Sequence, residues 1–209
     1  NAECKVLVLG SGGLIGSALV KVGVRAVEVV NRTHIDLRIP GALDVFKYEF
    51  PRSCYSNESI EFVFFLACEV GGSKYIDNQT GNVQLDIIQN NLLIYQTVFP
   101  WLARRRIPFV FTSSYLQSQS TSYGTIKRLG ESWIKGWNTS IGLGKSVRLW
   151  NIYGMEKHGI KSHVLTDWVT SCLVDGRIDC RTDGTEARQF LHADDCAAAL
   201  GNGNSMLCV

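Results

Sequence analysis

A tyrosine and a lysine with a spacing that suits proton transfer lie past the middle of the chain. Tyr123 and Lys127 belong to the run Tyr123-Gly124-Thr125-Ile126-Lys127, and a helix through it places both side chains on one face, one turn apart. An ammonium group beside a phenol favours the phenolate, which brings the tyrosine's pKa towards the range for acid or base catalysis. Ser114, which ends the preceding strand segment, can hydrogen-bond the same substrate oxygen. The three residues predict acid–base chemistry at a substrate oxygen.

A glycine-rich turn near the beginning of the chain predicts a dinucleotide site. It comes directly after a short apolar run and opens a predicted helix, which is the context that pyrophosphate binding requires. Gly10 permits the sharp turn, Gly13 lets the backbone approach a pyrophosphate, and Gly16 allows close helix–strand packing. The helix N-terminus adds free N–H groups and a positive dipole end. A purely structural turn is the alternative; the cofactor residues assigned here are Gly10, Gly12, Gly13, Leu14, Ile15 and Gly16.

The residues after the second predicted strand bear on which dinucleotide is bound. An acidic residue at this strand end suits NAD, whereas a cation suits the 2′-phosphate of NADP. Arg32 follows the strand here and favours NADP slightly over NAD, with a surface arginine as the alternative. Asp36 lies several residues beyond the strand end, where it is expected to line the adenine pocket.

Buried strands alternate with helices over most of the chain, which predicts an α/β fold with a doubly wound parallel Rossmann sheet. The predicted strands are Lys5–Leu9, Ala26–Val30, Glu61–Ala67, Ile107–Phe111 and Ser146–Trp150. The predicted helices are Leu14–Val22, Val83–Leu102 with a break near Pro100, and Tyr123–Trp137. Residues 1–154 are expected to form the dinucleotide-binding domain that carries the serine, tyrosine and lysine.

Residues 155–209 have a different pattern. A helix is expected over His163–Val174, a short strand near Ile178, and a loop leading into His192-Ala193-Asp194-Asp195. This segment is expected to be a small, apparently truncated C-terminal substrate lobe.

Composition narrows the classes of partner. The net charge is +2 with the basic residues spread along the chain, so no nucleic-acid partner is expected. Seven cysteines form no CxxC pair and no His/Cys cluster, which predicts buried, reduced thiols and no metal site. The first strand begins at Lys5, which leaves no room for a signal peptide, and no apolar run could span a bilayer. A cytoplasmic protein without membrane association is therefore expected.

Two further motifs follow the Ser/Tyr/Lys set along the chain. Arg148-Leu149-Trp150-Asn151-Ile152-Tyr153-Gly154 is similar to R-x-x-N-x-Y-G, and the run Arg188 to Asp195 is similar to R-[DE]-F-[IVL]-H-V-D-D. With the glycine turn and the Ser/Tyr/Lys set, these residues resemble the extended short-chain dehydrogenase/reductase family of nucleotide-sugar epimerases and dehydratases. The resemblance implies a nucleotide-sugar substrate and hydride transfer at a sugar carbon. It implies that Tyr123 moves the hydroxyl proton, that Lys127 also holds the nicotinamide ribose, and that Ser114 orients the oxygen. Further implied cofactor residues are Ala67, Asn91, Thr112, Tyr123 and Lys127, and implied substrate residues are Asn151, His163 and Arg188.

Three features resemble the GDP-L-fucose synthase branch of the family: Arg32-Thr33, Val70-Gly71-Gly72 and Ser162-His163-Val164. That resemblance implies that His163 donates a proton during epimerisation; the alternative is a helix-start residue that only packs or hydrogen-bonds. It also implies that Arg188 binds the substrate diphosphate, the alternative being a salt bridge to Asp194 or Asp195. The two long helices imply a homodimer through a four-helix bundle, and burial within one subunit would give the same pattern.

The chain also departs from the family. Only eight residues separate Ser114 from Tyr123, and Leu116-Gln117 stand near the position of an aromatic–glycine pair. Glu69 replaces a basic residue of the fucose synthases, and the chain stops soon after Asp195. Two functions remain open: a nucleotide-sugar oxidoreductase or epimerase, and a non-catalytic dinucleotide-binding redox sensor or scaffold.

Overall fold

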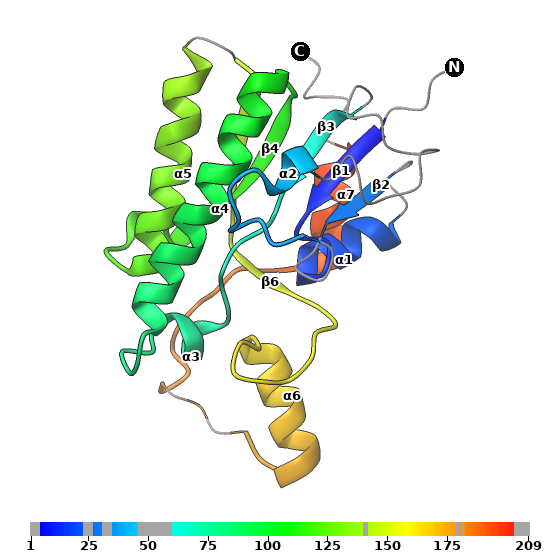
Figure 1. Ribbon diagram of the computed structural model, residues 1–209. Coiled ribbons are helices and arrows are strands. Elements are labelled where there is room, and N and C mark those ends of the chain that lie inside the picture. The colour runs from blue at the N-terminus through cyan, green and yellow to red at the C-terminus, as the bar shows by residue number, and fades with distance from the viewer. Residues whose placement is uncertain are drawn as a thin grey trace.

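Five parallel strands form the main sheet of the molecule (Figure 1). The computed structural model describes residues 5–22, 27–30, 35–45, 60–139, 142–178, 180 and 182–202. The strands are β1 (Lys5–Leu9), β2 (Val27–Val30), β3 (Ile60–Phe65), β4 (Phe109–Ser114) and β5 (Gly144–Leu149). Their order is β2-β1-β3-β4-β5. The chain changes direction across the sheet between β1 and β3, and ligands of such sheets bind outside the carboxyl ends of the strands at this point.

Helices cover both faces of the sheet, which confirms the doubly wound α/β fold (Figure 1). On one face α4 (Val83–Arg105) and α5 (Ser122–Asn138) pack against an apolar cluster that contains Phe65, Phe99 and Phe111. On the other face α1 (Leu14–Lys21) and α7 (Ala193–Asn202) pack against β-strand residues such as Val6 and Val8. Short elements complete this part of the chain: α2 (Ala42–Val45), α3 (Ser73–Ile76) and the 3-10 helix η2 (Tyr115–Ser118).

Helix α4 shows where the expected element boundaries were wrong. It runs through Pro100 without a break and ends at Arg105, followed by the C-cap residue Arg106, whose φ is +54°. A proline inside a helix removes one backbone hydrogen bond. Neighbours on both sides of it, such as Phe99 and Trp101, are almost fully buried, and this packing holds the helix together across the defect.

A smaller region extends from the carboxyl end of the sheet. It consists of a two-stranded parallel sheet, β6 (Asn151–Tyr153) with β7 (Phe190–His192), and of helix α6 (Val164–Asp175), which Figure 1 shows set apart from the main sheet. Ile178 lies outside any strand, so the strand expected there is wrong. The proposed boundary after residue 154 stays a prediction. Helix α7, although it follows the small region in the chain, packs back against α1, where Lys21 pairs with Asp194 at 2.7 Å.

Candidate active site

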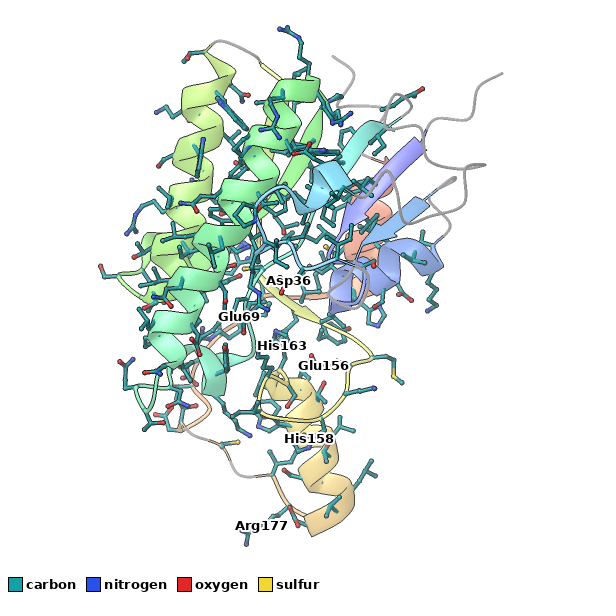
Figure 2. The ribbon with its side chains drawn as sticks, viewed as in Figure 1. Asp36, Glu69, Glu156, His158, His163 and Arg177 are labelled. Carbon is teal, nitrogen blue, oxygen red and sulfur yellow. The ribbon has the colours of Figure 1, made fainter. Side chains whose placement is uncertain are left out.

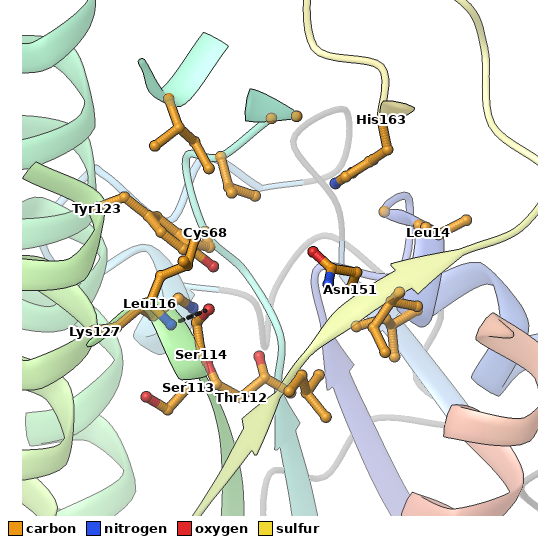
Figure 3. A pocket seen from close by; sticks show the side chains of 18 of the residues that line it. Leu14, Cys68, Thr112, Ser113, Ser114, Leu116, Tyr123, Lys127, Asn151 and His163 are labelled. Carbon is orange, nitrogen blue, oxygen red and sulfur yellow. Dashed lines mark hydrogen bonds between the residues drawn. The ribbon is translucent and has the colours of Figure 1, made fainter. Parts of the chain in front are cut away.

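One cavity of about 500 Å³ opens at the carboxyl ends of β1, β3 and β4 (Figure 3). Most of the residues singled out from the sequence line it: Gly10, Gly13, Leu14, Ile15, Gly16, Ala67, Thr112, Ser114, Tyr123, Lys127, Asn151, His163 and Arg188. The glycine turn, the Ser/Tyr/Lys set and the expected substrate residues therefore meet in one place, although they come from segments far apart in the sequence.

The glycine turn is built for close backbone approach. Gly10 has a φ of +95°, and a Cβ there would lie 2.7 Å from the backbone nitrogen of Ala67. A Cβ on Gly16 would collide with the carbonyl oxygen of Gly10. Gly13 caps α1 without a side-chain hydrogen bond, so the first N–H groups of the helix are left for a ligand. This cradle fits the pyrophosphate of a dinucleotide.

Ser114, Tyr123 and Lys127 lie together on one side of the cavity (Figure 3). All three side chains are buried, with Lys127 only 3% exposed. The Nζ of Lys127 donates to the carbonyl oxygen of Thr112 at 2.7 Å and lies 5.5 Å from the centre of the Tyr123 ring. The hydroxyl of Ser114 accepts from the Leu116 N–H at 3.2 Å, and its proximity to the Tyr123 phenol works to lower the pKa of that phenol. Helix α5 carries the tyrosine and lysine on one face because they are four residues apart. Its N-terminus is fixed by the Thr121 hydroxyl, which accepts from the Gly124 N–H at 3.0 Å.

Burial decides the direction of the Tyr123 pKa. Desolvation raises the pKa of Tyr123 above its ordinary value and outweighs the opposing pull of the Lys127 ammonium. The sequence led us to expect the opposite net direction. The Lys127 ammonium does work to lower the pKa of Tyr123, as expected, but in the protein alone the phenol keeps its proton at neutral pH.

Cys68 is a site residue that the sequence interpretation missed. It lines the cavity beside Tyr123 and Lys127 (Figure 3), and the Lys127 ammonium works to lower its pKa. Burial nevertheless raises the pKa of the Cys68 thiol, so at neutral pH it is a neutral neighbour of the lysine. The sequence did offer one signal for this residue: Cys68 directly follows the predicted strand Glu61–Ala67, and residues that follow parallel strands lie at the ligand-binding edge of the sheet.

An aromatic pair stands beside Ser114, where the sequence shows no aromatic–glycine pair. Tyr115 and Trp150 stack with ring centres 3.7 Å apart and an angle of 17° between their planes. Trp150 lines the cavity and is 44% exposed. Aromatic surface is thus present at the rim of the cavity, supplied by residues other than Leu116 and Gln117.

The expected substrate residues come from the small region. Asn151 donates from Nδ2 to the carbonyl oxygen of Gln189 at 3.0 Å, which ties β6 to the segment before β7. Arg188 is exposed and lines the cavity. His163 directly precedes α6 and hydrogen-bonds Glu156, a partner that no sequence pattern indicated (Figure 2).

Three predicted cofactor residues within the described part of the chain do not line this cavity. Gly12 is exposed beside it. The Asp36 carboxylate accepts from Nε and Nη2 of Arg38, at 2.9 and 2.5 Å, and from the backbone N–H of Arg38 at 3.0 Å. Asn91 is fully buried and fixes the backbone of Glu69 through hydrogen bonds of 2.9 and 3.0 Å, so it positions the loop after β3. Arg32 lies outside the described residues, and its role stays a prediction.

The loop after β3 is clamped to the loop before α6. Gly72 donates its N–H to the carbonyl oxygen of Lys161 at 2.9 Å, and a Cβ on Gly72 would collide with the carbonyl oxygen of Ser162. Glu69, buried at 8% exposure, pairs with the Lys161 ammonium and accepts from the Tyr75 hydroxyl at 2.7 Å. The unusual acidic residue at position 69 therefore has a cation opposite it, and the pair holds the segment that leads to His163.

Exchanging the charges of this pair tests the clamp. Glu69→Lys alone is expected to lower the free energy of unfolding by about 2 kcal/mol, because it places two cations together in a half-buried site. Adding Lys161→Glu should restore most of that loss, measured by urea unfolding. The control adds Lys157→Glu to Glu69→Lys instead. Lys157 is an exposed neighbouring lysine, so this change should restore none of the lost stability. Equal stability of the single and double variants would contradict the pairing.

The sequence matches the NAD dependent epimerase/dehydratase family over residues 6–201. The chain belongs to this family. No curated protein matches it in sequence, whereas solved structures match it in fold. The resemblance to extended short-chain dehydrogenases is thereby confirmed.

Three solved structures illustrate the likeness in fold. MlghC, a GDP-mannoheptose C4 reductase from Campylobacter jejuni with NADP bound, has a TM-score of 0.75 at 20% identity over 99% of this chain and 76% of its own. A GDP-L-fucose synthetase from Naegleria fowleri bound to NADP has a TM-score of 0.73 at 20% identity, over 98% of this chain and 74% of its own. A UDP-glucose 4-epimerase has a TM-score of 0.70 at 20% identity, over 97% of this chain and 73% of its own. At these identities the likeness establishes the fold.

Two further observations concern the described part of the chain. In the part of the chain that the structure describes, no helix is both long and apolar enough to cross a bilayer. Within the same residues, no group of three or more His, Cys, Asp or Glu side chains is placed to hold a metal ion.

Proposed function

We propose that the chain is an NAD(P)-dependent oxidoreductase or epimerase that works by hydride transfer at a sugar carbon of a nucleotide sugar. One observation carries the proposal: Ser114, Tyr123 and Lys127 line the same cavity as the glycine turn. A module that only binds a dinucleotide needs the turn but not the buried acid–base set. The non-catalytic redox sensor is the second candidate, favoured by the short connection between Ser114 and Tyr123.

The protein's own groups supply the proton and its alignment. When bound, the nicotinamide would give or take the hydride. Tyr123 holds a proton at neutral pH because burial raises its pKa, so it is set to donate to a carbonyl oxygen that is being reduced. Ser114 lines the cavity beside this phenol and orients the substrate oxygen. Lys127 stays in place through Thr112 and offers its remaining donors to the nicotinamide ribose.

The outer end of the cavity suits an anionic nucleotide. Arg188 is an exposed cation on the lining, where a guanidinium can bind a diphosphate with two parallel hydrogen bonds. Asn151 and His163 line the same cavity and complete the proposed substrate site. NADP is proposed as the preferred dinucleotide, supported by Arg32 in the sequence and by the NADP in two structures of the same fold.

A screen of cofactors and sugars tests the function. The protein is titrated with NADPH and NADH by fluorescence, and then incubated with GDP-, UDP- and dTDP-linked keto sugars while the nicotinamide absorbance is followed. Oxidation of NADPH with at least one sugar is expected, together with tighter binding of NADPH than of NADH. Tight binding of cofactor with no reaction across the whole set would instead support the redox sensor.

The assembly is part of the proposal. Leu93 on α4 and Leu129 on α5 are both exposed, at 37% and 39%, so each helix keeps an apolar residue on its outer surface. We propose that these two helices form a four-helix homodimer interface in a cytoplasmic enzyme. Gel filtration at low concentration should give the mass of a dimer, and a monomer would refute the interface.

A further inference from the structure

Glu156 holds His163 by two hydrogen bonds (Figure 2). Its Oε1 accepts from the backbone N–H of His163 at 2.7 Å, and its Oε2 lies 2.8 Å from Nδ1 of the ring. The carboxylate side chain is 16% exposed, whereas the imidazole is 38% exposed. One residue thus fixes both the main chain and the ring plane at the start of α6.

The ionisation state of the Glu156 carboxyl group determines which nitrogen of the His163 ring carries the proton. Burial works to raise the pKa of Glu156, but hydrogen bonds from His163 and Thr166 outweigh it and hold the pKa below its ordinary value. An ionised carboxylate can only accept hydrogen bonds. Nδ1 must therefore be the protonated nitrogen, and Nε2 of the neutral ring is left with its lone pair.

The free side of the ring belongs to the cavity. His163 is part of the lining, and Figure 3 shows it approaching from the side opposite Tyr123 and Lys127. A substrate held between these two sides would meet a proton donor at its oxygen on one side and an imidazole nitrogen on the other. The imidazole is then placed for a carbon-bound proton rather than for the oxygen.

We propose that Glu156 is the positioning residue that presents Nε2 of His163 to a carbon beside the substrate carbonyl, an inference that rests on the proposed function. Nε2 takes the proton of that carbon, so a C–H bond breaks and an N–H bond forms. The electron pair of the broken bond moves towards the carbonyl oxygen and gives an enolate. The ring becomes an imidazolium beside the Glu156 carboxylate, and the reverse step returns the proton to carbon. The logic is that of the carboxylate that orients a catalytic histidine in hydrolases.

The tautomer of His163 tests the pairing without any substrate. The four histidines of the chain are labelled with ¹⁵N, and the His163 signals are assigned by their loss in His163→Gln. Long-range ¹H–¹⁵N spectra of the neutral ring are expected to show the proton on Nδ1 in the native protein. Glu156→Gln should move a substantial fraction of the proton to Nε2, whereas Glu61→Gln, at an exposed carboxylate in β3, should change nothing. A native ring protonated mainly on Nε2 would overturn the proposal.

Proton exchange tests the consequence for chemistry. With a GDP-linked 4-keto hexose in D₂O, the loss of the ¹H signals beside the carbonyl measures C–H exchange independently of hydride transfer. Glu156→Gln is expected to slow exchange about 10²-fold while NADPH oxidation persists, and Glu156→Asp should recover part of the rate. Exchange that is unchanged in Glu156→Gln would overturn the positioning role. If the native protein oxidises NADPH with none of the sugars, the proposed function fails, and the tautomer still decides whether Glu156 sets the ring.

Discussion

Replacing Tyr123 with phenylalanine is expected to lower turnover about 10³-fold, the range in which a positioned acid–base group contributes. The change removes the phenol proton that Ser114 and Lys127 align, and leaves the ring that fills the buried side of the cavity. The glycine turn is untouched, so the dissociation constant for NADPH should stay within about twofold of the native value. Steady-state rates with the responsive sugar and a fluorescence titration with NADPH measure the two quantities.

A second tyrosine provides the control for this result. Tyr153 in β6 packs edge-on against His192 and lies outside the cavity lining. Tyr153→Phe removes a hydroxyl of the same kind and should leave turnover nearly unchanged. If Tyr123→Phe kept native turnover, the acid–base role of Tyr123 would be refuted. A parallel loss of turnover and of NADPH binding would show instead that the phenol supports the shape of the site.

Two alanine substitutions in the glycine turn should separate folding from cofactor binding. In Gly16→Ala the new methyl group meets the carbonyl oxygen of Gly10, and it lies 2.7 Å from the Cα of Ser11. Backbone atoms cannot move aside cheaply, so the free energy of unfolding is expected to fall by about 3 kcal/mol. In Gly13→Ala the methyl group lies 3.4 Å from the same carbonyl oxygen, which the fold tolerates. That methyl group occupies the surface where a pyrophosphate would rest, so NADPH affinity should fall about 10²-fold.

Urea unfolding and NADPH titration of both variants measure this separation. Gly136→Ala is the matched control, since a Cβ there meets no atom within 4 Å and the residue lies inside α5. It should be neutral or slightly stabilising. Native NADPH affinity in Gly13→Ala would contradict the placement of the pyrophosphate on this turn.

The parts of the fold that sequence predicts best are those with local causes. The first strand, the turn and α1 follow from an apolar run, spaced glycines and helical spacing within residues 5–21, and the structure has them there. Strand ends were less certain because polarity misleads at a buried edge. The predicted strand range stopped at Phe111, whereas β4 continues through Thr112, Ser113 and Ser114, all three buried, because β5 pairs with each of them.

Contacts between distant segments could not be predicted in the same way. Glu69 and Lys161 are 92 residues apart, and nothing in either local pattern points to the other. Glu156 lies in an irregular loop, where no periodicity indicates which way a side chain turns. Asn91 was expected at the cofactor from a resemblance, but its place in the fold is a buried clamp on the loop after β3. Packing decides such roles, and packing depends on the whole chain.

The packing of the C-terminal helix α7 against α1 has a consequence for folding during synthesis. One face of the sheet is completed by Ala193, Cys196, Ala197 and Leu200, which cover Val6 and Val8 from the earliest strand. A ribosome releases the strand long before the residues that cover it, and contacts of such sequence separation form late in folding. Throughout synthesis the growing chain therefore carries an uncovered apolar surface on its nucleotide-binding half. Cells that express the protein rapidly should rely on chaperones that shield this surface until about residue 200 has emerged.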